Sequence, residues 1–142
     1  MLKILIAVDG SGHAERAIEA VGKMARSSLD LEALLLCVSP EPVFYGDYTL
    51  GTIQKIEEDQ RIQQNAILTK AMAHARKHEL KLSEPVRAYG VIANEIVRAA
   101  NELQVDQIAM GTRGMGAIAG MLMGSVAQQV IHHSPVPVLL VK

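Results

Sequence analysis

Residues 110–125 read MGTRGMGAIAGMLMGS, and this glycine-rich stretch decides the fold that we expect the chain to adopt. An apolar run at 105–110 predicts a buried strand before it, and residues 126–131 carry apolar side chains at helical spacing after it. Glycine lets a backbone approach a ligand closely, and a helix start offers unpaired N–H groups and the positive end of the helix dipole. The stretch therefore predicts a phosphate-binding loop between a strand and a helix of an α/β protein.

The spacing of the glycines separates this loop from the dinucleotide fingerprint and from the Walker A loop. Gly111 is followed by two residues and Gly114, and then by nine residues and the pair Gly124-Ser125. This pattern resembles the ATP-binding signature of the universal stress protein family. The resemblance covers the whole chain, because the segments at 4–11, 109–114, 124–126 and 134–141 also look like those of the family.

Length and composition limit the class of protein. A chain of 142 residues is expected to form one domain, residues 1–142, with a single core. A net charge of −1 and an aromatic content of 3% argue against a nucleic-acid partner. No apolar run approaches the roughly 20 residues that span a bilayer, so no membrane role is expected. The start Met1-Leu2-Lys3 runs straight into a strand without a signal peptide, which predicts a cytoplasmic protein.

Apolar strand patterns alternate with helical patterns along the chain. Strands are predicted at 2–8, 31–38, 85–89, 105–110 and 136–141, and helices at 13–28, 53–80, 92–103 and from 125 onward. This alternation predicts an α/β fold, a single open five-stranded parallel sheet with helices on both faces. The family resemblance implies the strand order 3-2-1-4-5, which places a ligand crevice between strands one and four. Residues 43–52 are interpreted as a mobile loop beside that crevice.

The end of the first strand supplies a candidate polar ligand. Asp9 is predicted either to contact the ribose hydroxyls or a phosphate-bound Mg²⁺, or to serve as a turn or helix-capping residue. The family resemblance favours the ribose or metal role. It also implies that Ala7 and Val8 contact the nucleotide and that Val38 reads adenine through its backbone. Met110, Gly90 and Ile92 are expected either to wall the cleft or to be ordinary packing residues.

Each residue of the loop has two interpretations. Gly111 and Gly114 either turn backbone N–H groups toward phosphate oxygens or only provide turn geometry. Ser125 either donates its hydroxyl to a phosphate or to the water shell of a metal, or caps its own helix. Arg113 either neutralises a phosphate or points to solvent. The predicted cofactor-binding residues are Ala7, Val8, Asp9, Val38, Met110, Gly111, Arg113, Gly114, Gly124, Ser125 and Val126.

Other reactive side chains are assigned structural roles. His74 and His78 lie four residues apart and could share a helix face as metal ligands, but no third ligand is evident, so a solvated face is favoured. Cys37, the one cysteine, excludes an intramolecular disulfide. It is interpreted as a small core residue and not a nucleophile. No metal-ligand set and no catalytic residue are assigned.

The resemblance implies an ATP-binding module of the stress response, with Mg²⁺ carried by the nucleotide. It also implies a homodimer through the very apolar last strand, Val136 to Val141, which would cover an exposed sheet edge. Two alternatives stay open: a slow ATPase or phosphotransferase, and a structural dimer that binds no nucleotide.

Overall fold

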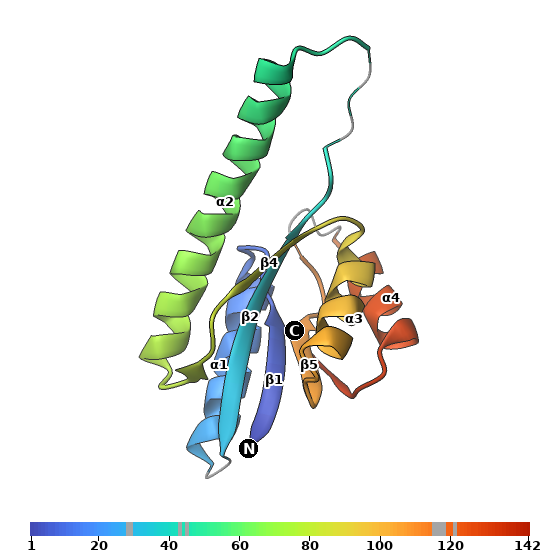
Figure 1. Cartoon of the computed structure of the whole chain (residues 1–142). Helices are drawn as coiled ribbons and strands as arrows, with labels where there is room; N and C mark the ends of the chain where they lie inside the picture. The colour runs from blue at the N-terminus through green and yellow to red at the C-terminus, as the bar shows by residue number, and fades with distance from the viewer. Residues whose placement is uncertain (28–29, 43, 45, 115–118, 121) are drawn as a thin grey trace.

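Parallel pairing joins all six strands of the computed structural model, which describes the chain apart from residues 28–29, 43, 45, 115–118 and 121 (Figure 1). The strands are β1 (Leu2–Ala7), β2 (Leu31–Ser39), β3 (Lys81–Leu82), β4 (Val86–Tyr89), β5 (Gln107–Gly111) and β6 (Val138–Val141). The helices are α1 (Gly12–Arg26), α2 (Leu50–Lys77), α3 (Ile92–Glu102) and α4 (Ser125–His133). The predicted α/β class and the parallel sheet are confirmed.

The strand order is β3-β2-β1-β5-β6, with β4 also paired to β2. With β4 taken as the third predicted strand, the predicted order is confirmed, and β6 lies at a sheet edge. The prediction of five strands was wrong by one, because the chain pairs twice with β2. The two-residue β3 aligns with Glu32 and Ala33, and β4 aligns with residues 36–39 after Pro85 interrupts the ladder.

Alternate strand residues supply the two halves of the core. Ile4 and Ile6 of β1 pack in one apolar cluster with α1 and with Leu68 of α2. Leu5 packs in a second cluster with α3 and α4, on the other side of the sheet. Because successive side chains of a strand point to opposite faces, one continuous apolar run fills both layers. The sheet thus carries α1 and α2 on one face and α3 and α4 on the other (Figure 1).

Both ends of α2 differ from the prediction. The hydroxyl of Thr49 accepts a hydrogen bond from the N–H of Thr52 at 3.1 Å, so α2 starts at Leu50 and the predicted loop at 43–52 ends three residues early. Residues 43 and 45 of that loop lie outside the described residues. At the other end the helix stops at Lys77, because Glu79 takes a left-handed φ of 62°.

The first half of α2 projects beyond the sheet (Figure 1). The buried residues of α2 all lie in its second half, namely Gln64, Leu68, Ala71 and Ala75. Gln64 is fully buried, and its side-chain amide donates to the backbone oxygens of Ala88 at 3.0 Å and of Cys37 at 3.4 Å. These bonds tie α2 to the ends of β2 and β4, and residues 50–63 extend past this point.

Among the described residues, no helix combines the length and the apolar character that a bilayer crossing demands.

Candidate functional site

The carboxyl ends of β1 and β5 lie side by side, and Asp9 faces the glycine-rich loop there. The Asp9 carboxylate accepts a hydrogen bond from the N–H of Ser11 at 2.9 Å, which closes the turn into α1. Its second oxygen lies against Gly114, where an added Cβ would overlap it. Ser11 in turn caps α1 by accepting from the N–H of Ala14 at 3.2 Å. The structure therefore brings Asp9 and Gly114 together at the predicted crevice.

Gly111 is required for space and not for turn geometry. A Cβ at this position would lie 2.5 Å from Cβ of His13 and 3.0 Å from the carbonyl carbon of His13. The glycine thus lets the end of β5 touch the start of α1. None of the three signature glycines is in the left-handed region; the described glycines with positive φ are Gly10, Gly46, Gly90 and Gly120. A left-handed backbone is therefore not what requires glycine at these three positions.

The start of α4 lies beside Thr112, at the end of β5 where the crevice is predicted. Gly124 is the N-cap residue, with φ −75° and ψ 164°, and no described side chain caps the helix. The alternative in which Ser125 caps its own helix was wrong, because Ser125 is the first helical residue and is exposed. Gly124 N–H donates to the Thr112 oxygen at 2.7 Å, which joins the two ends of the loop. The first-turn N–H groups and the helix dipole therefore favour an anion at this point.

Four of the predicted cofactor-binding residues meet in one apolar cluster. Ala7, Val38, Met110 and Val126 all pack on the face of the sheet covered by α3 and α4. Val8 does not join them, because its side chain is buried in the cluster beneath α1 and α2. The backbone N–H of Val8 donates to the Leu36 oxygen at 2.8 Å, and Met110 is buried, so the half-buried Ala7, Val38 and Val126 are the partly exposed members of the four-residue group.

Positive charge gathers where α1 begins. The positive charges of the half-buried Arg113 and the exposed Arg16 both disfavour protonation of His13. A guanidinium nitrogen of Arg16 lies 3.1 Å from Nδ1 of His13. Desolvation lowers the pKa of His13, and the charges of Arg16 and Arg113 lower it further, against the opposing charge of Asp9. Arg16 also donates to the backbone oxygen of Lys142 at 2.7 Å, which holds the guanidinium beside the crevice. Arg16 was not among the predicted site residues, although its position three residues after His13 places both on one helix face.

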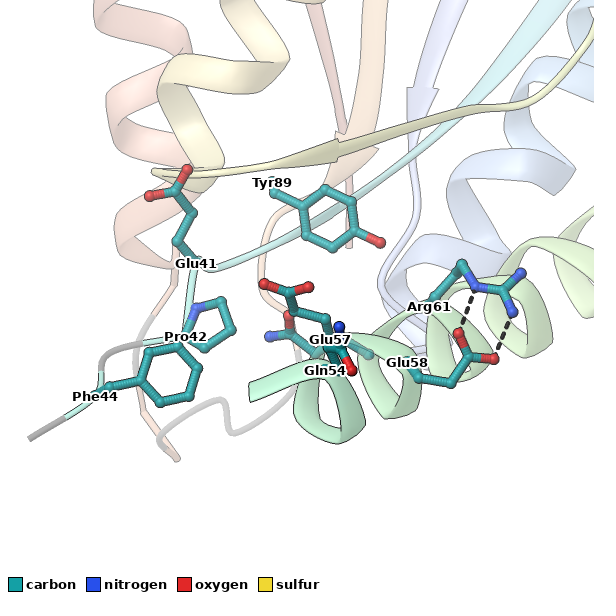
Figure 2. Close-up of a pocket in the computed structure, with 9 residues that line it drawn as sticks. Glu41, Pro42, Phe44, Gln54, Glu57, Glu58, Arg61 and Tyr89 are labelled. Atoms are coloured by element: carbon teal, nitrogen blue, oxygen red, sulfur yellow. Dashed lines mark hydrogen bonds and ion pairs between the residues drawn. The ribbon is translucent and has the colours of Figure 1, made fainter. Parts of the chain in front are cut away.

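A separate cavity of about 700 Å³ lies between the projecting half of α2 and the end of β4 (Figure 2). Its lining includes the carboxylates of Glu41, Glu57 and Glu58, of which Glu58 is paired with Arg61, and the ring of Tyr89. The surplus of negative charge disfavours a phosphate. By its charge, this cavity is therefore a less suitable phosphate site than the glycine-rich loop beside Arg113.

The prediction that Cys37 is a core residue is confirmed. The residue is 2% exposed, and burial raises the pKa of its thiol to about 11, with a further contribution from the negative charge of Asp9. At neutral pH the reactive thiolate is therefore about 100-fold rarer than for an ordinary thiol, because each pKa unit is a factor of ten.

Cys37 is accordingly expected to be inert in the folded protein. Its reaction with Ellman's reagent at pH 7.5 should be at least about 100-fold slower in the native protein than in guanidinium-unfolded protein. Similar rates in both states would contradict the burial of the thiol.

The interpretation of His74 and His78 as a solvated face without a third ligand was wrong. Both histidines are half-buried, and Glu19 of α1 lies beside them. This group stands apart from the crevice, against the other half of α1.

Known proteins resemble the chain along its whole length. A model of the universal stress protein family matches residues 1–142. A universal stress protein of Thermus aquaticus is 32% identical over an alignment of 142 positions, and this alignment covers 98% of this chain and 97% of that protein. Among solved structures, universal stress protein UspA from Lactobacillus plantarum gives a TM-score of 0.80 at 19% identity, covering 99% of this chain and 97% of that one. A family protein from Arabidopsis thaliana with AMP bound gives a TM-score of 0.72 at 18% identity, covering 100% of this chain and 92% of that one. The two structural likenesses bear on the fold.

Proposed function

This chain belongs to the universal stress protein family, and on that premise we propose that it binds ATP, with Mg²⁺ carried by the nucleotide, between the ends of β1 and β5. The observation that carries the proposal is the contact of Gly114 with the Asp9 carboxylate. The Asp9 carboxylate would accept hydrogen bonds from hydroxyl groups of the ligand. The start of α4, which has no side-chain cap, would bind its phosphates.

Each part of the nucleotide has matching surface in this crevice. The half-buried Ala7, Val38 and Val126, which pack in one cluster with the buried Met110, are suited to form an apolar wall for the base. The carboxylate of Asp9 is suited to accept hydrogen bonds from ribose hydroxyls. The N–H groups at the start of α4 and the charge of Arg113 are suited to the phosphates. Solved universal stress proteins in complex with AMP, dAMP and cAMP support an adenine nucleotide as the ligand class.

We propose a regulatory role in the cytoplasm and not catalysis. Phosphoryl transfer requires a positioned base for the attacking water and a charge clamp on the leaving phosphate. Asp9, the acidic candidate of the crevice, already accepts a hydrogen bond from Ser11. A slow ATPase is the second candidate, and it rests on the proximity of Asp9 and the loop that carries Arg113.

One residue provides a route from the crevice to the proposed dimer edge. Thr112 accepts from Gly124 N–H at 2.7 Å and donates to the Val141 oxygen of β6 at 2.9 Å. β6 lies at the sheet edge that the homodimer through residues 136–141 would cover. A nucleotide that prefers one arrangement of the α4 start would thereby shift the dimer equilibrium, to the extent of its differential affinity.

Titration calorimetry with MgATP, AMP and cAMP tests this function. The wild type is expected to bind at least one of them with micromolar affinity, and Gly124→Val to bind about 10-fold more weakly or worse, because the side chain would crowd the phosphate site. The contacts of an added Cβ at Gly124 are ordinary, at 3.5 and 3.6 Å, so the variant should keep its fold. Gly51→Val is the matched control, because no atom lies within 4 Å of a Cβ there.

Three further outcomes bear on the proposal. ATP consumption in the titrated sample would favour the slow ATPase. A wild type that binds none of the three nucleotides would contradict the proposal and favour a structural dimer that binds no nucleotide. A strictly monomeric protein at micromolar concentration, by analytical ultracentrifugation, would contradict the dimer.

A further inference from the structure

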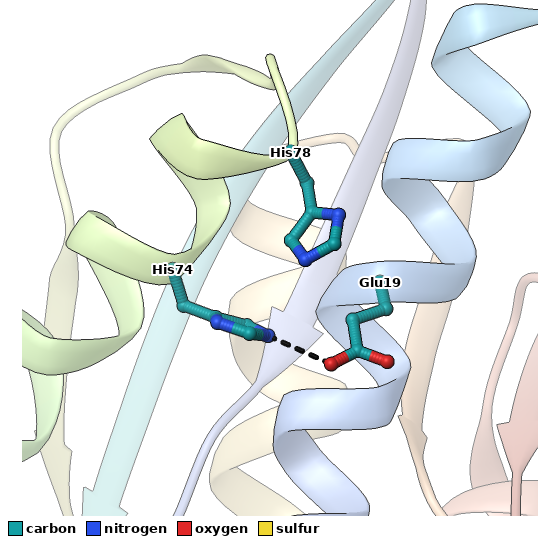
Figure 3. A group of neighbouring side chains, drawn as sticks. All are labelled: Glu19, His74 and His78. Carbon is teal, nitrogen blue, oxygen red and sulfur yellow. Dashed lines mark hydrogen bonds and ion pairs between the residues drawn. The ribbon is translucent and has the colours of Figure 1, made fainter.

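A second polar cluster joins the two helices of the α1–α2 layer, away from the crevice. Glu19 of α1 faces His74 and His78 near the end of α2 (Figure 3). Nε2 of His74 lies 3.0 Å from Oε1 of Glu19, and the two imidazole rings are 4.8 Å apart between centroids. One ligand atom from each of the three side chains lies within 4.8 Å of the other two.

The backbone beneath the cluster is held in place by close packing. Gly22, one turn after Glu19, lies so near the end of α2 that an added Cβ would be 2.9 Å from Cβ of His78. The Arg26 guanidinium donates to the backbone oxygen of His78 at 3.4 Å and not to its ring. One turn earlier on both helices, Lys70 pairs with Glu15 at 3.4 Å. The three side chains thus project from two helices whose separation is fixed, and the side chain of His74 is only 23% exposed.

Two imidazoles and one carboxylate form a ligand set that suits zinc. Zinc binds histidine nitrogen and carboxylate oxygen at about 2.0–2.2 Å, so the ligand atoms of a tetrahedral site lie roughly 3.3 Å apart. The pair formed by Glu19 and His74 already has nearly this separation. A side-chain rotation of His78, which is half-buried at the end of α2, would bring in the third ligand. The fourth position would be left for water.

We propose that Glu19, His74 and His78 form a binding site for Zn²⁺ that links α1 to α2. A metal held by both helices binds the folded chain and not the unfolded one, so it stabilises the fold by mass action. The site lies apart from the nucleotide crevice and does not depend on nucleotide binding.

Thermal unfolding of the EDTA-treated protein, followed by circular dichroism, tests the site. ZnCl₂ at about 100 times its dissociation constant is expected to raise the Tm by about 5–10 °C, whereas MgCl₂ should not. CoCl₂ should give the visible absorption bands of tetrahedral Co²⁺, and ZnCl₂ should abolish them. Glu19→Gln should weaken the affinity for Zn²⁺ about 10-fold or more, and His74→Gln with His78→Gln should remove both signals.

The chain offers a matched control. The rings of His132 and His133 on α4 also lie 4.8 Å apart between centroids. His132→Gln with His133→Gln should leave the zinc shift and the cobalt bands intact. A wild type without zinc shift and without cobalt bands would overturn the proposal, as would a zinc shift that survives His74→Gln with His78→Gln and disappears in the α4 variant.

Discussion

Gly111→Ala is expected to lower the free energy of unfolding by about 3 kcal/mol, the upper range for overpacking a tight contact. The new Cβ would lie 2.5 Å from Cβ of His13 and 3.0 Å from backbone atoms of His13 and Arg113. Backbone lies on two sides of the methyl group, so no rotation of a side chain relieves the clash. The start of α1 and the end of β5 would have to separate, against the cores that hold both.

Chemical and thermal unfolding measure this cost. A loss of 3 kcal/mol corresponds to a fall in Tm of about 6–12 °C for a chain of this size. Gly51→Ala is the control with the same chemical change, because the space around residue 51 is open, and its Tm should stay within about 2 °C of the wild type. A Gly111→Ala protein as stable as the wild type would show that β5 and α1 do not approach as closely as described.

Gly114→Ala should keep the fold and lose about 10- to 100-fold in nucleotide affinity. The new Cβ would overlap one carboxylate oxygen of Asp9, which is the tip of a side chain and can move. The carboxylate would leave the position in which we propose that it accepts the ribose hydroxyls. Hydrogen bonds to a charged group contribute about 1.5–3 kcal/mol, which corresponds to the stated range of affinity.

A double-mutant cycle with Asp9→Asn separates this effect from general damage. If Gly114→Ala acts through Asp9, each single variant weakens MgATP binding and the double variant is little worse than either. Additive losses in calorimetry would mean that residue 114 contacts the nucleotide on its own account. Equal affinity of Gly114→Ala and wild type would refute the role of this contact.

Much of the sheet could be predicted because its strands are buried on both faces. A run such as residues 33–38 is continuously apolar, and turn residues end it, so its type and bounds follow from composition. The strand β3 could not be predicted, because two residues, Lys81 and Leu82, carry no pattern. Their pairing depends on the neighbouring β2 and not on their own side chains.

The helix ends show a second limit. Glu79 and Gln104 take left-handed φ values of 62° and 49°, where a sequence rule expects glycine. Each is followed by a buried apolar residue whose N–H bonds back into the helix, as Leu80 does to the oxygen of Ala75 at 3.1 Å. Packing of that apolar residue offsets the unfavourable backbone, so tertiary contacts and not local propensity end these helices.

Part of the candidate site could be predicted from the sequence, and part could be recognised only from the structure. The glycine spacing predicted a crevice at the end of β5, but the spatial reason for two of the glycines came from neighbours distant in sequence, Asp9 for Gly114 and His13 for Gly111. Glu19 was missed as a partner of His74 because 55 residues separate them, and the geometry of the α1–α2 layer alone brings them together.

The projecting half of α2 would turn a small tilt of the helix into a larger displacement of its first residues (Figure 1). The Gln60 amide donates to the Pro40 oxygen at 3.0 Å, and the residues before it, 50–59, measure about 15 Å at 1.5 Å per residue. A tilt of about 10° at Gln60 would carry the start of the helix through roughly 3 Å, more than the radius of a water molecule. The cavity beside Tyr89 lies against this part of the helix. A small change in the packing of the buried half of α2 would therefore change the width of the acidic cavity beside Tyr89.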